Sequence, residues 1–125
     1  MAIPTRQRIR RPAEFRRVFA RGRRTSGEYV NFVALRNELP LSRIGLSVSK
    51  RVGCAVTRNF VKRRMRNALA EMNIANGWDV VATAKPDAPG VSYAVFDETM
   101  KKSLARLGIR IHPTGSSTGN LGTGV

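Results

Sequence analysis

Basic side chains recur at helical spacing between residues 55 and 66, and they are the side chains of this chain best suited to bind a ligand. If the stretch is a helix, Arg58, Lys62 and Arg66 share one stripe, with Asn59 and Arg63 on its flank. Stacked like charges repel one another, and no Asp or Glu is interleaved to pair with them. A polyanion offsets this repulsion, because each neutralised phosphate releases condensed counterions. The stretch is therefore predicted to contact phosphates, and the alternative is a cationic face that contacts only solvent.

The charge of the whole chain also favours a polyanionic partner. Its 125 residues include 23 Lys or Arg and 8 Asp or Glu, which gives a formal net charge of +15. Residues 1–24 hold nine arginines and one acid, and residues 43–66 hold eight basic residues and no acid. Binding to a lipid surface would need a basic helix with an unburied apolar face. No apolar run is long enough to span a bilayer, and no signal peptide is evident. We therefore expect a soluble cytoplasmic protein that binds nucleic acid.

Groups for catalysis by the protein itself are few. The chain has one histidine, His112, and one cysteine, Cys54, and its acids are dispersed. These residues offer no internal disulfide, no Cys/His zinc set and no nucleophile paired with a base. We therefore expect no catalytic residue and no protein-held metal.

Neighbouring helices and strands must position the basic helix. Hydrophobic periodicity and turn residues predict where these elements lie in the sequence. The predicted order is a helix over Pro12–Arg21, strands over Glu28–Arg36 and Arg43–Val52, a helix capped by Thr57 and ended by Asn76-Gly77, a strand over Trp78–Ala84, and a helix from the cap Ser92 to Gly108. We expect residues 37–42 to close an antiparallel hairpin between the first two strands. In the second strand, Ile44, Leu46 and Val48 should be buried, and the opposite face of small polar residues should be exposed to a ligand.

These elements indicate one α+β domain, an α/β sandwich in the order helix, two or three strands, helix, strand, helix around one small sheet. Residues 1–11 show no hydrophobic period and are predicted to be a basic N-terminal arm. Residues 12–112 form the predicted RNA-binding domain. Residues 113–125 are rich in Gly, Ser and Thr and are predicted to be a disordered tail.

Two segments together resemble the signature of the protein subunit of bacterial ribonuclease P. They are the strand R-I-G-L-S-V-S-K-R-V-G at residues 43–53 and the helix with Arg58-Asn59, Lys62-Arg63 and Arg66. The segments at residues 14–22, 29–35 and 78–86 match the family's layout in order and spacing, so the resemblance covers about residues 6–107. The chain departs from the family at Phe60, where arginine is most usual.

The resemblance implies a subunit of an endoribonuclease that removes the 5′ leader from precursor tRNA. It implies that the RNA subunit is the catalyst, with Mg²⁺ held mainly by that RNA and none by the protein alone. The implied partners are the catalytic RNA subunit and precursor tRNA, without DNA or a membrane, for a protein monomeric within the ribonucleoprotein. The family's sandwich also has a left-handed β-α-β crossover, against the usual rule.

The resemblance also implies two binding sites. The helix residues Arg58, Asn59, Lys62, Arg63 and Arg66 would face the RNA subunit. A cleft between the first helix and the sheet would hold the single-stranded leader, with the residues Phe15, Phe19, Phe32, Ser49, Lys50 and Arg51. Aromatic side chains beside basic groups hold single strands by stacking on the bases. For each phenylalanine the competing interpretation is core packing.

Two other functions fit parts of the sequence. A small structural RNA-binding protein, such as a ribosomal protein, would share the size and charge but would need no aromatic cleft. A protein-only nuclease would need clustered acids to hold a metal, and none lies between residues 43 and 66.

Overall fold

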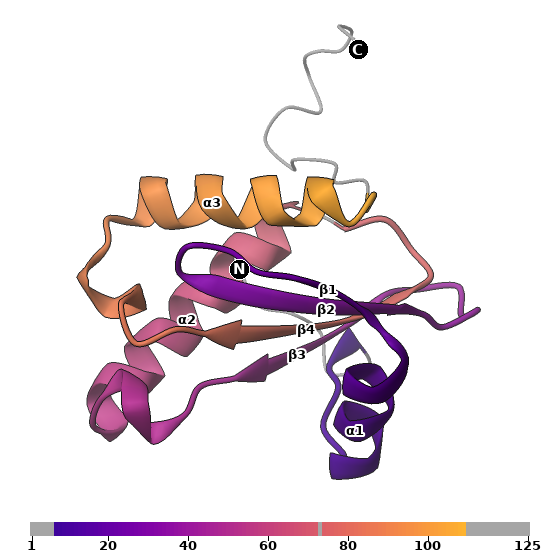
Figure 1. The fold of residues 1–125 in the computed structure, drawn as a ribbon, viewed down its shortest axis with the longest axis horizontal. Helices are drawn as coiled ribbons and strands as arrows, with labels where there is room; N and C mark the ends of the chain where they lie inside the picture. The colour runs from indigo at the N-terminus through magenta and orange to yellow at the C-terminus, as the bar shows by residue number, and fades with distance from the viewer. Residues whose placement is uncertain (1–6, 73, 110–125) are drawn as a thin grey trace, which may run out of the picture.

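A computed structural model describes residues 7–72 and 74–109 and places one mixed sheet between helices (Figure 1). The elements in chain order are α1 (Pro12–Arg21), β1 (Arg23–Thr25), β2 (Val30–Arg36), β3 (Arg43–Ser47), the 3₁₀ turn η2 (Lys50–Val52), α2 (Ala55–Met72), β4 (Trp78–Ala84), the 3₁₀ turn η3 (Ala88–Gly90) and α3 (Tyr93–Arg106). Helix α1 covers one face of the sheet, and α2 and α3 cover the other. The predicted α+β sandwich is confirmed, and the optional third strand before the basic helix is β1.

The strand order is β1-β2-β4-β3, so β4 is central and separates β2 from β3. Strand β4 pairs antiparallel with β2 and parallel with β3. The predicted hairpin between β2 and β3 is therefore wrong. The physical reason is burial, because Val80, Val81 and Ala82 are fully buried, and an inner position gives β4 hydrogen-bonding partners along both edges while the helices cover both faces. A parallel β3–β4 pair in turn needs a long crossover, which α2 provides. The left-handed sense of this crossover stays a prediction.

Strand β3 is shorter than predicted, and only part of its polar face is open. It ends at Ser47, and Lys50–Val52 form η2 instead of continuing the strand. Ile44 is buried, and Leu46 and Val48 pack partly against the main core, as expected from the alternation. On the opposite face Gly45 is buried, and a Cβ there would lie 2.7 Å from Cε1 of Phe15. Helix α1 therefore covers this end of the face that the sequence predicted to be exposed.

The N-terminal segment contributes to the core. Ile9 is buried with Val18, Val33 and Val81 beneath α1, and its backbone N–H donates to the carbonyl of Ile44 at 2.8 Å. The sequence predicted a basic arm over residues 1–11, and the structure corrects this at Ile9, which packs as a core residue beside β3. A single isoleucine among arginines carries no period that could have shown this. The predicted tail over residues 113–125 lies outside the described residues.

Helix boundaries follow local signals in two helices and depart from them in the third. Helix α1 spans the predicted residues, and Ser92 caps α3 by accepting a hydrogen bond from the N–H of Val95. Helix α2 begins at Ala55, so Thr57 lies inside its first turn and is not the N-cap. The helix also ends at Met72, before the predicted stop at Asn76-Gly77. Its buried residues Val61, Met65, Ala68, Leu69 and Met72 fix it against the sheet.

Candidate nucleic-acid interface

The basic residues of α2 lie on different sides of the helix. Lys62 and Arg66 are half-buried and face the edge strand β3. Asn59 and Arg63 are exposed and face the turn η3. Arg58 belongs to neither group, and its Nε is buried with no hydrogen-bond partner among the described residues. Lys62 and Arg66 of the predicted stripe therefore lie beside β3, and its flanking residues Asn59 and Arg63 lie beside η3.

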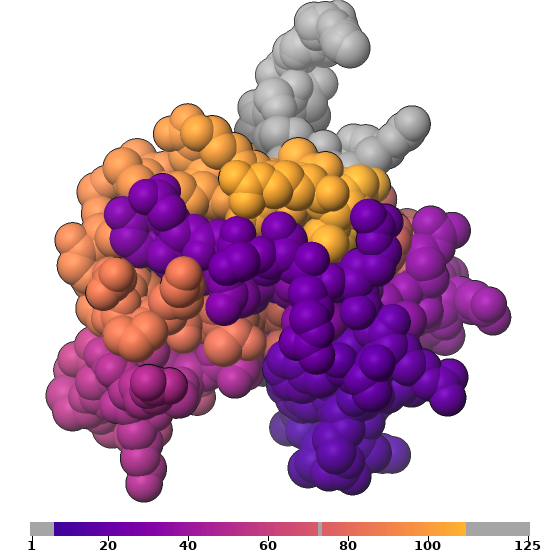
Figure 2. All heavy atoms as spheres, viewed as in Figure 1, coloured from indigo at the N-terminus to yellow at the C-terminus, as the bar shows by residue number. Residues whose placement is uncertain are grey.

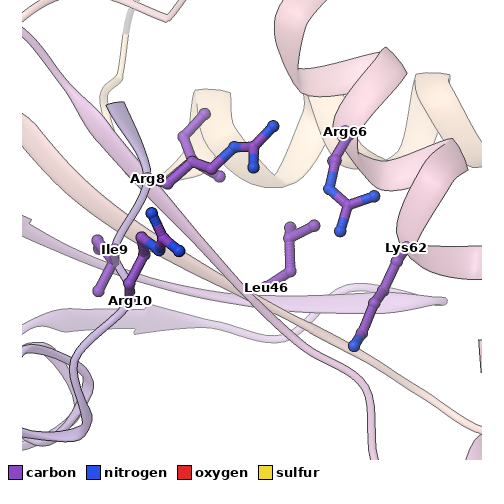
Figure 3. Close-up of a pocket in the computed structure, with 7 residues that line it drawn as sticks. Arg8, Ile9, Arg10, Leu46, Lys62 and Arg66 are labelled. Atoms are coloured by element: carbon purple, nitrogen blue, oxygen red, sulfur yellow. The ribbon is translucent and has the colours of Figure 1, made fainter. Parts of the chain in front are cut away.

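Lys62 and Arg66 join two arginines from the N-terminal segment in one pocket. Its lining residues are Arg8, Ile9, Arg10, Ile44, Leu46, Lys62 and Arg66. Figure 3 shows Arg8 extending toward α2, and Arg66 and Lys62 projecting from α2 beside Leu46. Four cationic side chains and no acid line this pocket. Such a concentration of charge beside an apolar floor suits a phosphate group, which accepts several charge-assisted hydrogen bonds at once.

The other face of the sheet carries the aromatic residues of α1. Phe15 and Phe19 pack partly against the small core beneath α1 and remain half-buried. The guanidinium of Arg24 lies 5.9 Å from the ring centroid of Phe19. Phe15 and Phe19 therefore lie together between the first helix and the sheet, where they are only partly covered.

Phe32 does not share this site. It is 0% exposed and lies in the main core with residues of α2 and α3, on the opposite face of the sheet from Phe15 and Phe19. The interpretation of Phe32 as a cleft residue is therefore wrong, and core packing is correct. Alternation along β2 places Phe32 with Val30 and Ala34. Val30, Phe32 and Ala34 on that face are all apolar and buried, which is typical of the larger core.

Polar residues occupy the part of the α1 face that the helix leaves open. Ser47 pairs with Thr83, which in turn pairs with Asn31, so the three form one row across β3, β4 and β2. All three are half-buried. Figure 2 shows the molecule hollowed between the indigo lobe of α1 and the magenta lobe that contains η2. This hollow can hold an extended strand against the sheet.

Ser49, Lys50 and Arg51 lie shortly after the end of β3 and are all exposed. The hydroxyl of Ser49 accepts a hydrogen bond from the backbone N–H of Arg51, and Ser49 thereby caps the start of η2. The two cationic side chains therefore belong to the magenta lobe, across the hollow from α1 (Figure 2).

A buried ion-pair network fixes α1 against the sheet. The guanidinium of Arg43 in β3 donates to both carboxylate oxygens of Asp79 in β4, at 2.9 and 2.6 Å, and to Glu14 of α1 at 2.9 Å. Arg17 of α1 lies 3.6 Å from Asp79, and the side-chain amide of Asn37 donates to the same carboxylate at 2.8 Å. These contacts link one end of α1 to two strands and so set the position of its aromatic residues.

The network shifts the pKa of each group in one direction. Burial by itself would raise the pKa of Asp79, but hydrogen bonds from Arg43 and Asn37 and the charges of Arg43 and Arg17 hold it below its ordinary value. The same balance lowers the pKa of Glu14, where burial is opposed by the backbone N–H of Arg11 and by Arg43. The Asp79 hydrogen bond raises the pKa of Arg43. All three groups are therefore charged at neutral pH.

Sequence reasoning missed four residues of these two surfaces. Arg8 and Arg10 were grouped with the arm, because two arginines around one isoleucine are too short a pattern to predict a strand. Asn31 and Thr83 are polar residues among apolar neighbours in β2 and β4, and a polar residue in such a position can mark a place that no helix covers. Alternation alone could have found Asn31, because it lies between Val30 and Phe32.

Among residues 7–72 and 74–109, no group of three or more His, Cys, Asp or Glu side chains is placed to hold a metal ion. No helix in the described ranges is long and apolar enough to cross a membrane.

Comparisons with known proteins agree on one family. The family described as Ribonuclease P matches residues 3–108. The ribonuclease P protein component of Dehalococcoides mccartyi is 38% identical over 99 residues, which cover 79% of this chain and 82% of the relative. That of Geobacillus kaustophilus is 42% identical over 100 residues, covering 78% of this chain and 79% of the relative.

Solved structures give the same result for the fold. The RNase P protein of Staphylococcus aureus superimposes with a TM-score of 0.72 at 26% identity, covering 80% of this chain and 94% of that one. The RNase P protein of Thermotoga maritima has a TM-score of 0.72 at 24% identity, covering 79% of this chain and 96% of that one. The second likeness bears on the fold alone.

Proposed function

The chain belongs to the bacterial ribonuclease P protein family, and from this premise we propose that it binds the RNA subunit of ribonuclease P and the 5′ leader of precursor tRNA. Relatives that carry the name ribonuclease P protein component support a role in this endoribonuclease complex. Family membership argues against the two alternatives from the sequence, a ribosomal protein and a protein-only nuclease.

The observation that carries the RNA-binding proposal is the cationic pocket beside β3. Lys62 and Arg66 come from α2, and Arg8 and Arg10 come from the opposite wall, so phosphates in this pocket meet cations from both sides. A predicted stripe on one helix could be a solvated face. Convergence of two separate segments on one acid-free pocket supports a bound polyanion instead.

The leader would occupy the hollow on the other face of the sheet. The partly exposed rings of Phe15 and Phe19 offer stacking surfaces, and Ser47, Thr83 and Asn31 offer hydrogen bonds along the floor. Lys50 and Arg51 add positive charge on the far side of the hollow. Stacking and backbone contacts of this kind hold single strands with little choice of sequence.

We propose that the protein contributes binding and positioning, and that the RNA subunit performs the hydrolysis. Mg²⁺ would be held by phosphates of the RNA, because the described residues supply no group of ligands for it. We further propose that the protein acts in the cytoplasm as a monomer within the ribonucleoprotein, without DNA or a membrane as partner.

The test of RNA-subunit binding uses the salt dependence of affinity. Lys62→Ala and Arg66→Ala should each weaken binding and reduce the magnitude of the log-log salt slope by roughly 1, because each removes one phosphate contact. The matched control is Lys102→Ala on α3, which is exposed and pairs with Glu98. An unchanged slope for both α2 variants, equal to that of the control, would contradict the proposal.

The test of leader binding compares precursor with mature tRNA. Phe19→Ala in the reconstituted ribonucleoprotein should weaken precursor binding by about 1 to 3 kcal/mol, because one base loses its stacking partner. Affinity for mature tRNA, which lacks the leader, should stay unchanged. Thermal melting of the variant shows whether it is folded. A folded variant with a wild-type ratio of the two affinities would place the leader elsewhere.

A further inference from the structure

Another hollow lies on the side of α2 that faces η3, near the start of the helix. It is lined by Val56, Thr57, Asn59, Phe60, Arg63 and Pro89, so it lies between the first turns of α2 and the turn η3. No acidic residue lines it. The cationic pocket beside β3 has none of these lining residues. The pocket and this hollow are therefore separate parts of the α2 surface.

Contacts from residues outside this hollow hold the ring of Phe60 in place. The guanidinium of Arg64 lies 4.7 Å from its ring centroid and 5.8 Å from that of Tyr93. Arg64 also donates a hydrogen bond to the carbonyl of Val91. Phe60 packs against the edge of the main core as well. These contacts fix the ring before any ligand arrives, so little side-chain entropy is lost when a ligand stacks on it.

The chemistry of the lining fits a flat group with an apolar face and a polar edge. Val56 is 78% exposed, the largest exposure among the large hydrophobic side chains of the described residues. With Phe60 and Pro89 it supplies apolar surface, and Asn59 and Arg63 supply hydrogen-bond donors beside it. Aromatic and apolar surface next to cationic donors is the combination that binds unpaired nucleobases.

We propose that this hollow is a base-binding subsite, in which one unpaired nucleobase of the RNA subunit stacks on Phe60. Arg63 contacts the adjoining phosphate, and the side-chain amide of Asn59 reads the edge of the base. The proposal rests on the proposed function, because it takes the RNA subunit as the occupant. Continuity supports that choice, since the hollow lies on the same helix as the phosphate-binding residues Lys62 and Arg66.

The subsite explains the substitution at position 60. Arginine, the residue most usual there in the family, would add a phosphate contact that weakens with salt. Phenylalanine replaces it with a stacking contact, which releases no counterions and so persists at high salt.

The experiment measures affinity for the isolated RNA subunit against salt concentration. Phe60→Leu keeps apolar contact with the core but removes the aromatic face, and it should weaken binding by about 5- to 150-fold with an unchanged salt slope. Phe60→Tyr should restore binding to near the wild-type value. Leu39→Ala, which alters another exposed hydrophobic residue far along the chain, is the matched control and should change nothing.

A second variant and a second readout keep the test decisive. Val56→Ser should leave the melting temperature unchanged, because Val56 is exposed, and should weaken binding about threefold. Base-specific chemical probing should show one unpaired base that the wild-type protein protects and Phe60→Leu does not.

Three results would overturn the subsite. They are wild-type affinity for both Phe60→Leu and Val56→Ser, a lower salt slope for Phe60→Leu, and an effect of these variants on self-association alone. Failure of the proposed function looks different, because the wild-type protein would then not bind the RNA subunit at all.

Discussion

Replacing Asp79 with Asn tests whether the ion-pair network holds α1 in place. The substitution keeps the size of the side chain and removes its charge, so it opens no cavity. The Asp79 side chain is 1% exposed and that of Arg43 is 17% exposed, so the Arg43 guanidinium loses its main partner in a largely buried setting.

The size of the effect follows from what remains around Arg43. Breaking a buried ion pair costs about 3 to 5 kcal/mol, because one charge is left without compensation. Glu14 still accepts a hydrogen bond from Arg43, so we expect the lower end, about 3 kcal/mol. That is a large fraction of the roughly 5 to 15 kcal/mol that stabilises a domain. The melting temperature should fall by about 10 °C.

Urea unfolding at several pH values is the assay, followed by far-UV circular dichroism and by the fluorescence of Trp78, the single tryptophan. The pKa of Asp79 is lowered in the folded state, so its stabilising contribution is complete above the unfolded pKa of about 3.9 and is lost as the pH falls through the folded pKa. The difference between wild type and Asp79→Asn should therefore be constant near neutral pH and shrink below about pH 4.

The matched control is Asp87→Asn, because Asp87 is exposed and its replacement should change stability by less than about 0.5 kcal/mol. The reasoning fails if Asp79→Asn costs no more than this control. It fails equally if the difference between Asp79→Asn and wild type does not shrink below about pH 4, because the charge of Asp79 is then not the source of the stability.

Three further predictions concern packing and catalysis. Gly45→Ala should destabilise the protein by about 1 to 3 kcal/mol in urea unfolding, because its Cβ would press on the ring of Phe15; wild-type stability would show that α1 does not pack closely there. Phe32→Ala should cost about 3 to 5 kcal/mol, and Phe32→Leu, if folded, should keep the wild-type ratio of precursor to mature tRNA affinity; a changed ratio would return Phe32 to the leader site. The protein freed of RNA should not cleave precursor tRNA in the presence of Mg²⁺, because no catalytic group is predicted in it; cleavage by such a preparation would contradict this.

Local signals predicted the elements well where a residue acts on its own neighbours. Pro12 begins α1, Ser92 caps α3, and the apolar run at residues 78–84 forms β4 with the predicted bounds. Strand order was not predictable in this way. The pairing of β2 and β3 with β4 depends on which strand is most buried in the folded sheet. That comparison involves all the strands at once, so no single segment of sequence reveals it.

The candidate site was predictable in its chemistry and less so in its arrangement. Spacing on α2 identified Lys62 and Arg66, but the cations that face them come from a segment with no period. Alternation in β2 placed Phe32 on the face of Val30 and Ala34, yet alternation in one strand does not show which helix covers that face. Phe32 was therefore grouped with Phe15 and Phe19, although the sheet separates them.

The central strand of the sheet is the last to be synthesised. Residues 30–36 and 43–47 leave the ribosome well before residues 78–84, and neither strand pairs with the other. At about 5 to 20 residues per second, the nascent chain spends seconds with both strands lacking their shared partner. During that interval the apolar side of α2 has no sheet to cover it, while its arginines and lysine are already present. The order of synthesis thus exposes this chain to nonspecific capture by RNA before the fold has sorted its basic residues onto separate surfaces.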